Sequence, residues 1–209
     1  GVYSRYAEVT KMAAEIIGIR PSYTHFGAMH IVTCKKGTYF MADTLINRHP
    51  SSDVLIDIAR LTYDAVKFFA HDPVMAMLSY SSFGADKQGS PLKVHEAIKY
   101  LHKNHPEINI DGEMQVNFAL DKKMRDATYP FNKIHGKDVN TLVFPNLSSA
   151  NSAYKLLNEM GVVETLGPIQ MGLNKPIHFT DIGSTTRDIL NLTTVAVVDA
   201  IVQEQINKK

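Results

Sequence analysis

This 209-residue sequence has no tryptophan and a single cysteine, Cys34. One cysteine cannot form an intramolecular disulfide, which is typical of proteins from a reducing compartment, so we expect a cytoplasmic protein. The 22 basic and 21 acidic residues give a formal net charge of +1. This balance excludes bulk electrostatic attraction as a reason to bind nucleic acids or anionic membranes. We therefore expect neither of them as a partner.

Long apolar runs are absent as well. No segment approaches the length of about 20 apolar residues that a membrane-spanning helix requires. Residues 1–6 have neither the basic start nor the apolar centre of a signal peptide. They also lack an initiator methionine, so we expect the sequence to be a piece of a longer protein.

Common nucleotide-binding and zinc-binding patterns are missing too. The sequence contains neither G-x-G-x-x-G nor G-x-x-x-x-G-K-[ST], so we expect no NADP bound through a Rossmann fingerprint and no ATP bound through a P-loop. Its nine histidines show no H-E-x-x-H spacing, and we interpret each as a surface or satisfied core residue. We interpret Cys34 as a packed thiol. The sequence predicts no metal and no cofactor in this chain.

Strand-like and helix-like segments alternate along the sequence. Apolar residues at helical spacing predict helices over 6–18, 51–70, 92–102, 151–160 and 185–205. Apolar runs bounded by turn residues predict strands over 29–33, 38–41, 73–78, 108–110 and 141–144. This order of strands and helices predicts an α/β sandwich with a largely parallel sheet.

The last predicted helix is unusual because apolar residues cover almost all of its circumference between Ile189 and Ile201. Such a helix is typically buried on several sides. We therefore expect it to lie either in the core or at a subunit interface.

Three polar loops of small residues lead towards predicted helices, at 78–84, 144–151 and 180–186. Helix N-termini present free N–H groups and a positive partial charge, which suit phosphate groups. Open α/β sheets bind ligands at the edge where such loops lie, so the three loops indicate a nucleotide or acyl-phosphate cleft. The alternative is that serine and asparagine are common in turns and caps, and the pattern alone favours this alternative.

Two carboxylate features also leave alternatives open. Asp188 fits a general base, but it follows Thr185 at capping-box spacing, and the cap is the favoured interpretation. Asp111 and Glu113 fit an acid–base pair or a metal site, and in a strand they would point to the same face. The glycine between them makes a turn the favoured interpretation.

Six segments, taken together and in order, resemble one protein family. They are 40–47, 78–84, 111–115, 143–147, 150–155 and 167–176. The family is the phosphate acetyl/butyryl transferases, or phosphotransacetylases, and the resemblance covers nearly the whole sequence. Segments 78–84 and 143–147 most resemble the phosphotransacetylase-like C-terminal domain of hybrid bacterial NADP-dependent malic enzymes.

The resemblance implies a three-layer α/β/α sandwich of the phosphotransacetylase type, which is isocitrate/isopropylmalate dehydrogenase-like. It implies two lobes with an acyl-CoA cleft between them, and a homodimer formed by the second lobe. We expect residues from about 20 to 178 to form the second lobe. Residues 1–19 and 179–209 would then be helices that return to the first lobe, most of which is missing from this sequence.

The resemblance also implies a reaction, in which acyl groups move between CoA and phosphate. In the family a serine steadies the CoA thiol, an adjacent arginine binds the acyl phosphate, and a later aspartate deprotonates the thiol. The serine and arginine positions fall on Asp181 and Ile182, and the aspartate position falls on Asp188 as a vestigial general base. Because losing one oriented donor typically slows a reaction about 100- to 1000-fold, we expect no useful transfer and assign no catalytic residue.

The ligand contacts that the resemblance implies come from the polar loops, the closing segment and the first helix. They are Lys11, Ser79, Tyr80, Ser81, Ser148, Asn151, Gln170, Gly172 and Asp188. Lys11 takes the place of a family arginine that contacts CoA, and it keeps the charge without the fork geometry.

Three functions follow from the resemblance. The first is a non-catalytic, acetyl-CoA-sensing and oligomerisation domain of an NADP-dependent malic enzyme. Its partner would be an N-terminal domain of the same polypeptide, which oxidatively decarboxylates malate to pyruvate and CO₂ with NADP and Mg²⁺ or Mn²⁺. The second is an active phosphate acetyl/butyryltransferase. The third is a purely structural dimerisation domain.

Overall fold

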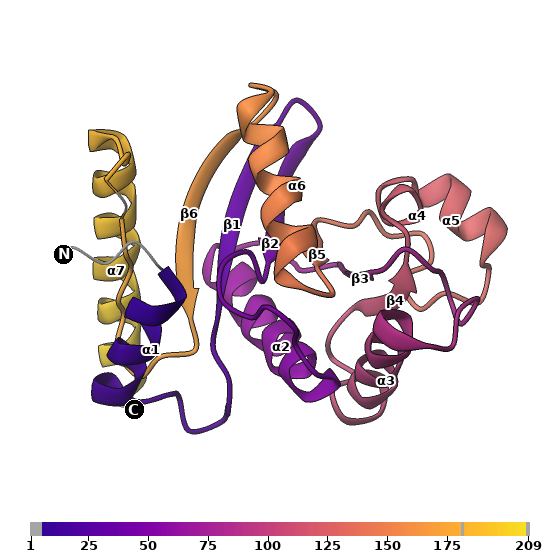
Figure 1. Cartoon of the computed structure of the whole chain (residues 1–209), viewed down its shortest axis with the longest axis horizontal. Coiled ribbons are helices and arrows are strands. Elements are labelled where there is room, and N and C mark those ends of the chain that lie inside the picture. The colour runs from indigo at the N-terminus through magenta and orange to yellow at the C-terminus, as the bar shows by residue number, and fades with distance from the viewer. Residues whose placement is uncertain (1–5, 181, 208–209) are drawn as a thin grey trace.

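The computed structural model describes residues 6–180 and 182–207, and within these it contains seven helices and six strands (Figure 1). The helices are α1 Tyr6–Ile17, α2 Ser52–Phe68, α3 Gly89–Asn104, α4 Val116–Leu120, α5 Lys122–Thr128, α6 Leu147–Glu159 and α7 Thr186–Asn207. The strands are β1 Gly27–Cys34, β2 Gly37–Ala42, β3 Met75–Leu78, β4 Ile110–Met114, β5 Thr141–Val143 and β6 Glu164–Met171. Each predicted helix and strand therefore has a counterpart, with shifted ends.

The six strands form one sheet in the order β4-β3-β5-β2-β1-β6. β4, β3, β5 and β2 are parallel neighbours, whereas β1 pairs antiparallel with both β2 and β6. Five of the described strands therefore run in one direction and β1 runs against them. This arrangement confirms the prediction of a largely parallel sheet.

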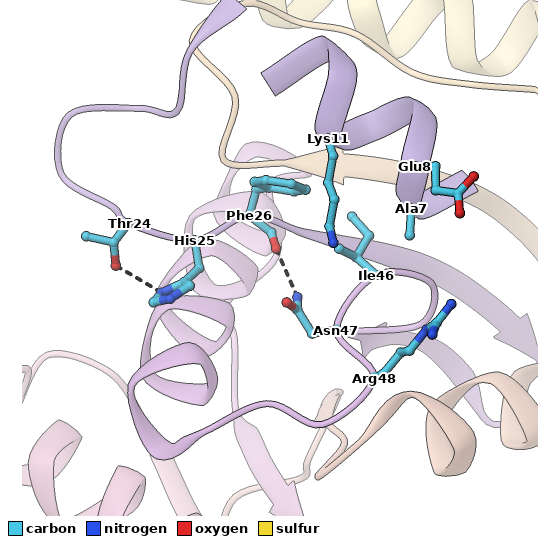
Figure 2. Close-up of a pocket in the computed structure, with 9 residues that line it drawn as sticks. All are labelled: Ala7, Glu8, Lys11, Thr24, His25, Phe26, Ile46, Asn47 and Arg48. Carbon is cyan, nitrogen blue, oxygen red and sulfur yellow. Dashed lines mark hydrogen bonds between the residues drawn. The ribbon is translucent and has the colours of Figure 1, made fainter. Parts of the chain in front are cut away.

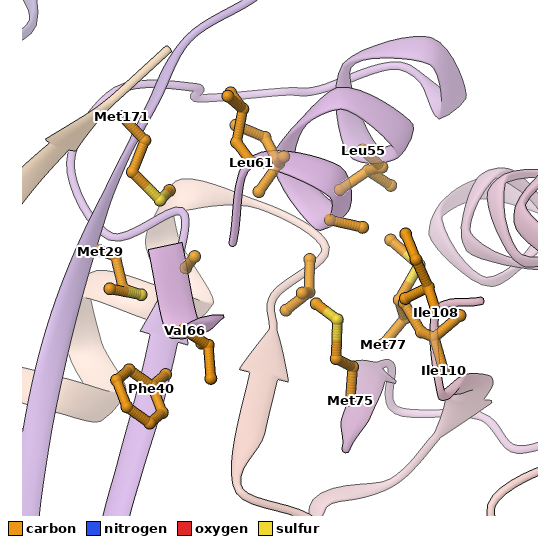
Figure 3. Close-up of a cluster of buried hydrophobic side chains, with 14 of the residues drawn as sticks. Met29, Phe40, Leu55, Leu61, Val66, Met75, Met77, Ile108, Ile110 and Met171 are labelled. Carbon is orange, nitrogen blue, oxygen red and sulfur yellow. The ribbon is translucent and has the colours of Figure 1, made fainter. Parts of the chain in front are cut away.

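Helices cover both faces of the sheet. α2 and α3 pack on one face, over a core that includes Met29, Phe40 and Met75 (Figure 3). On the other face, α4 and α6 contribute Ala119 and Ala150 to a smaller core. The three-layer α/β/α sandwich that the resemblance implied is thereby confirmed.

β3 has the sequence pattern of a strand that is covered on both faces. Met75 and Met77 enter the core under α2 and α3, whereas Ala76 and Leu78 enter the core on the opposite face. All four side chains are buried. Because neither face meets water, the strand is apolar throughout, which is why the run 73–78 predicted it.

The turn predicted at residues 111–113 is wrong. These residues belong to β4, which pairs in parallel with β3 and is buried along its whole length. Gly112 has a φ of 151°, and a Cβ atom at this position would lie 2.5 Å from the carbonyl oxygen of Met77. The glycine is therefore explained by the close approach of β3 and not by a turn.

β6 and the short helices α4 and α5 are elements that the sequence did not predict. In β6, Gly167 and Pro168 interrupt the apolar pattern, and the pairing with β1 shifts register opposite His30. A bulge at an edge strand accommodates a proline, which has no N–H to donate to the ladder. α4 and α5 span too few residues for helical periodicity to be recognised.

α7 packs against β6 along one edge of the sheet (Figure 1). Leu192 is buried in the core, but five other large apolar side chains of this helix are between 44% and 64% exposed: Ile189, Leu190, Val197, Val198 and Ile201. The expectation that the helix is buried in the core is therefore wrong for the described residues. Its burial at an interface stays a prediction. Among the described helices, none has the length and apolar character needed to cross a membrane.

Candidate functional site

The carboxyl ends of the five codirectional strands and the start of β1 lie at the same edge of the sheet. A cleft with a volume of about 600 Å³ opens at this edge. Its walls are α1, the segment before β1 and the loop after β2 (Figure 2). The residues that line it are Ala7, Glu8, Lys11, Thr24, His25, Phe26, Ile46, Asn47 and Arg48.

The loop after β2 is held in place by Asp43, a buried carboxylate. Its Oδ1 accepts the backbone N–H groups of Ala28, Leu45 and Ile46 at 3.1, 3.1 and 3.2 Å. Its Oδ2 accepts the backbone N–H of Asn47 at 2.7 Å and the Asn47 side-chain amide at 2.6 Å. Burial raises the pKa of the Asp43 carboxyl, and these hydrogen bonds act against the rise. Together they fix the loop that forms one wall of the cleft.

Asn47 is the polar side chain that this network presents to the cleft. Its Nδ2 also donates to the backbone oxygen of Phe26 at 3.0 Å, which joins the loop after β2 to the segment before β1. Both hydrogens of the amide nitrogen are then used, because the other is donated to Asp43. The amide oxygen of Asn47 is the group left for a ligand.

The segment before β1 is held by Asp57 of α2. Asp57 Oδ2 accepts the backbone N–H groups of Thr24 and His25 at 3.0 and 3.1 Å. The same oxygen lies 2.9 Å from His25 Nδ1, so Nδ1 donates to the carboxylate, and in the neutral form of the ring Nε2 would be an acceptor. Burial raises the pKa of the Asp57 carboxyl, but the hydrogen bonds from His25 and Thr24 outweigh burial and hold that pKa below its ordinary value.

The charges of the cleft are mainly positive. Lys11 and Arg48 each bring a permanent positive charge, and Glu8 brings one carboxylate. Figure 2 shows the Lys11 side chain extending from α1 towards Ile46 and Asn47. Ammonium and guanidinium groups bind phosphate oxygens, and arginine can do so with two hydrogen bonds. The arrangement is therefore suited to an anionic ligand that carries phosphate groups.

Lys11 is the one predicted ligand contact that lines this cleft, as far as the described residues show. Ser148 and Asn151 lie in the first two turns of the neighbouring α6. Asn151 donates to the backbone oxygen of Thr44 at 3.3 Å, and the N–H of Leu147 donates to the backbone oxygen of Arg48 at 3.4 Å. The start of α6 therefore supports the cleft wall from behind.

The predicted contacts in the loop after β3 form hydrogen bonds within that loop. Ser79 Oγ accepts the N–H of Ser81 at 3.3 Å, and Ser81 Oγ accepts the N–H of Asp86 at 2.9 Å. Tyr80 donates its hydroxyl to Asp86 Oδ2 at 2.6 Å, and this bond raises the pKa of Tyr80. β5 separates β3 from β2 in the sheet, so this loop shares the edge with the cleft without lining it.

Gln170 and Gly172 support the cleft from behind. Gln170 Nε2 donates to the backbone oxygen of Gly27 at 2.9 Å, and Gln170 Oε1 accepts the hydroxyl of Tyr6 at 3.3 Å. Gln170 thus ties α1 to β1. Gly172 has a φ of 91°, and a Cβ atom there would lie 3.1 Å from the Cα of Phe26. The glycine therefore lets the segment before β1 pass close to the end of β6.

Asp188 forms the predicted capping box at the start of α7. Its Oδ2 accepts the backbone N–H of Thr185 at 2.8 Å and the Thr185 hydroxyl at 2.7 Å, and its own N–H donates to Thr185 Oγ1 at 3.2 Å. The hydrogen bonds from Thr185 lower the pKa of the Asp188 carboxyl. Ile182 is fully exposed, and Asp181 lies outside the described residues.

Sequence reasoning missed four residues that shape the cleft: Asp43, Asp57, His25 and Arg48. Asp43 and the nearby Asn47 belong to the resemblance, but their roles depend on backbone donors that only the fold brings together. Asp57 lies on α2 and binds a loop that precedes β1, so no local spacing links it to His25. Among the described residues, no group of three or more His, Cys, Asp or Glu side chains could hold a metal ion.

A three-layer α/β/α sandwich with a basic cleft at the carboxyl edge of its sheet is an architecture that binds nucleotides and phosphorylated ligands. The family model described as phosphate acetyl/butaryl transferase matches residues 1–197. The chain belongs to this family, which confirms the resemblance seen in the sequence.

Individual relatives agree with this assignment. The chain is 33% identical over 206 residues to the NADP-dependent malic enzyme of Escherichia coli, covering 97% of this chain and 27% of that protein. It is 32% identical to the phosphate acetyltransferase of Bacillus subtilis, covering 93% of this chain and 60% of that protein. The crystal structure of a phosphotransacetylase from Streptococcus pyogenes superposes with a TM-score of 0.88 at 32% identity, over 96% of this chain and 61% of that one.

The chain therefore spans about a quarter of the malic enzymes and about 60% of the phosphate acetyltransferases that it matches. Both kinds of relative carry a region like this one, and the comparisons by themselves do not decide between them.

Proposed function

We propose that this chain is an acetyl-CoA-sensing domain without transfer activity, in an NADP-dependent malic enzyme. One observation carries the proposal: two basic side chains, Lys11 and Arg48, line the cleft, whereas Ile182 and the capped Asp188 leave the transfer machinery incomplete. The malic enzyme reaction, with NADP and Mg²⁺ or Mn²⁺, would belong to an N-terminal domain of the same polypeptide.

The properties of the cleft support acyl-CoA as the ligand. A volume of about 600 Å³ lies within the range of sites for cofactor-sized molecules. Lys11 and Arg48 would bind phosphate groups of CoA, and the amide oxygen of Asn47 would accept a hydrogen bond from the pantetheine arm. His25 Nε2 would add a second acceptor at the opposite wall.

Two residues before and at the start of α7 support the loss of acyl transfer. Isoleucine at position 182 offers no charge to an acyl phosphate. Asp188 Oδ2 accepts hydrogen bonds from the N–H and the hydroxyl of Thr185, and the lowered pKa of this carboxyl makes it a weaker base for a thiol. Each missing group of this kind is expected to raise the barrier by about 3–4 kcal/mol.

The same proposal includes a division of the chain between two lobes. Residues from about 20 to 178 would form the second lobe, and residues 1–19 and 179–209 would pack on a first lobe supplied by the rest of the polypeptide. The exposed apolar side chains of α7 support this arrangement, because a helix this apolar is typically covered on several sides. We also propose a homodimer through the second lobe, which the exposed apolar side chains Val116, Leu120 and Met124 support.

Sensing requires that acetyl-CoA favour one of two states of the assembly, because a ligand with equal affinity for both states changes nothing. The test is a titration of the full-length protein with acetyl-CoA, following heat of binding and the rate of malate oxidation in parallel. We expect saturable binding, a changed rate, and no acetyl phosphate formed from acetyl-CoA and phosphate. Absence of binding, or binding without any effect on malate oxidation, would overturn the proposal.

Substitutions in the cleft make this test specific. Lys11→Gln and Arg48→Gln should each weaken acetyl-CoA binding about tenfold, because each removes one charge-assisted contact to phosphate. Lys103→Gln, on α3 and away from the cleft, is the matched control and should bind acetyl-CoA as the unmodified protein does. Equal affinities in all three variants would place the acetyl-CoA site elsewhere.

An active phosphate acyltransferase is the second candidate, because phosphate acetyltransferases are among the relatives. It predicts thioester formation from CoA and acetyl phosphate, measured by absorbance, and a loss of that activity in Asp188→Ala. A purely structural domain is the third candidate. It predicts that deleting the domain disperses the oligomer, while acetyl-CoA never affects the intact protein.

A further inference from the structure

A second cavity lies at the other end of the sheet, where α3 faces β4. Its volume is about 330 Å³, and it has no part in the acyl-CoA proposal. The residues that line it are Phe83, His95, Ile98, Lys99, His102, Asp111, Gly112, Phe131 and Lys133. We propose that this cavity binds a small carboxylic acid with an apolar body.

One face of α3 forms the first wall of the cavity. His95, Ile98, Lys99 and His102 occupy positions i, i+3, i+4 and i+7, which lie on the same side of a helix. This side presents two imidazoles and an ammonium group to the cavity where a core-facing helix would present apolar residues. The core of α3 is formed instead by Val94, Ala97 and Leu101, with Ile98 at the boundary.

Aromatic rings form the opposite wall. Phe83 and Phe131 meet edge to face with their centroids 5.3 Å apart, and Tyr129 lies 4.6 Å from Phe83. Phe131 is 67% exposed, although its neighbours on this wall are aromatic. An apolar ligand body placed against Phe131 and Ile98 would remove this aromatic surface from water.

The carboxylates beside the cavity are engaged by the protein itself. Asp111 Oδ2 accepts the N–H of Lys133, Asp111 Oδ1 accepts the N–H of Gly112 at 2.9 Å, and the side chain is buried. Glu113, also buried, accepts the N–H of Gly84 with Oε1. Beside these carboxylates, the ammonium groups of Lys99 and Lys133 line the cavity and offer charge-assisted contacts to an anion.

His95 links the cavity to a buried oxygen that has no hydrogen-bond partner. Glu113 Oε2 lies 3.3 Å from His95 Nδ1, but no hydrogen bond forms there, and the oxygen is shielded from water. A buried carboxylate oxygen without a donor is unfavourable. His95 also lines the cavity, so a ligand carboxylate would accept a hydrogen bond from the same imidazole that lies beside Glu113.

The size of the cavity limits the ligand to a small molecule, and the described side chains around it do not form a metal site. A volume of about 330 Å³ is at the lower end for small-molecule sites, which fits one carboxylate and one ring. No three metal-ligating side chains converge anywhere in the part of the chain that the structure describes, so the carboxylates and histidines here do not form a metal centre.

The test uses hydrocinnamate as the probe and hydrocinnamyl alcohol as its uncharged counterpart, each titrated into the purified protein by calorimetry. We expect saturable binding of the acid and at least tenfold weaker binding of the alcohol. The double variant Lys99→Gln/Lys133→Gln should lose at least tenfold in affinity for the acid, because both charge-assisted contacts are removed. Lys103→Gln, on the same helix and outside the cavity, should bind the acid normally.

His95→Gln provides a second test, because it keeps a hydrogen-bonding side chain and removes the imidazole. It should weaken binding of the acid several-fold without altering the unfolding midpoint of the free protein. Lys11→Gln should leave hydrocinnamate binding intact, so failure of the acetyl-CoA proposal would not affect this result. Equal binding of acid and alcohol, no binding of either, or full affinity in the double lysine variant would overturn the proposal.

Discussion

His30 is buried in β1, where its ring stacks on Tyr154 at a centroid distance of 4.1 Å and its Nδ1 lies 2.8 Å from Thr44 Oγ1. Gly167 lies against the same ring, because a Cβ atom at this glycine would be 2.8 Å from His30 Cδ2. Glycine is therefore required at position 167 of β6, because the buried His30 ring occupies the space of a side chain. This contact explains a residue that the sequence reasoning treated only as part of a family signature.

Gly167→Ala should therefore destabilise the protein strongly. The substitution adds a methyl group against His30 at a φ of 147°, where an L side chain is strained, and the expected loss is about 2–4 kcal/mol in the free energy of unfolding. Gly161→Ala is the matched control, since its φ is also positive at 65° but nothing lies within 4 Å of the added Cβ. It should cost about 1 kcal/mol. Urea unfolding of both variants checks the difference, and equal losses would contradict the contact with His30.

The same histidine predicts a dependence of stability on pH. Burial, with repulsion from Lys155, lowers the pKa of His30 to about 4, whereas an unfolded chain would have a histidine pKa of about 6.5. Between these values the unfolded state binds more protons, so stability is complete above about pH 6.5 and falls as the pH drops towards 4. The full loss is about 3 kcal/mol.

Comparing His30→Phe with the unmodified protein isolates this effect. Phenylalanine keeps a ring against Tyr154 but does not titrate, so its free energy of unfolding should change less between pH 7 and pH 4.5. Urea denaturation at several pH values measures both slopes. Parallel slopes would show that His30 is not the titrating group.

Several helices and strands follow directly from local sequence. A helix was predicted to begin at residue 51, and Ser51 accepts the N–H of Val54 at 3.4 Å, as a cap residue does. β6 could not be predicted because its bulge places Gly167 and Pro168 in a strand. The part of β4 from residue 111 to 113 was mistaken for a turn, because Gly112 is there to allow the close approach of β3. Whether such segments form strands depends on pairing with strands that lie far away in the sequence.

The candidate site divides in a similar way. The polar loops pointed to the edge of the sheet where the cleft opens, because strand ends and polar loops are local features. Lys11, which the resemblance implied, lines this cleft, and its contact with a ligand stays a prediction. His25 and Arg48 could not be found, since their place depends on Asp57 and on the start of α6. The loop 79–81 and Gln170 were predicted as contacts, yet the structure gives them hydrogen bonds to the protein itself.

Arg125 organises α4, α5 and the segment that follows them. Its side chain is completely buried, and its guanidinium donates to the backbone oxygens of Ala119, Ile134 and Lys137 at 3.4, 3.1 and 2.7 Å. Only a planar group with several donors can reach three carbonyls at once. One side chain thus stabilises two short helices that have little periodicity of their own.

Arg125→Lys should lower the free energy of unfolding by about 2–4 kcal/mol. The guanidinium reaches the three carbonyls from two separate nitrogens, whereas the three donors of an ammonium share one nitrogen, so buried carbonyls would lose their donors. Arg187→Lys is the control, since Arg187 pairs with Glu164 at 3.1 Å on the surface. Its effect should stay within about 0.5 kcal/mol. Similar losses in the two variants would show that the three carbonyl contacts add little to stability.

At the scale of the whole molecule, one apolar side of α7 packs against the rest of the chain and a larger apolar side is exposed. If a first lobe of the parent protein covers this helix, Leu190→Glu should destabilise the parent by about 2 kcal/mol or more and leave the 209-residue chain almost unchanged. Thermal unfolding of both forms measures the contrast. An equal effect in the two forms would mean that α7 stays exposed in the parent.

The hydrogen bonds around Asp43 have a consequence for the dynamics of the cleft. The amide hydrogens of Ala28, Leu45, Ile46 and Asn47 all point at one buried carboxylate, although three of the four residues lie in a loop. Loop amides usually exchange with solvent deuterium within local openings, whereas these should exchange only in larger unfolding events. In a deuterium-exchange experiment this loop should therefore be as slow as the strands beside it, and the cleft wall would already have its final shape before any ligand arrives.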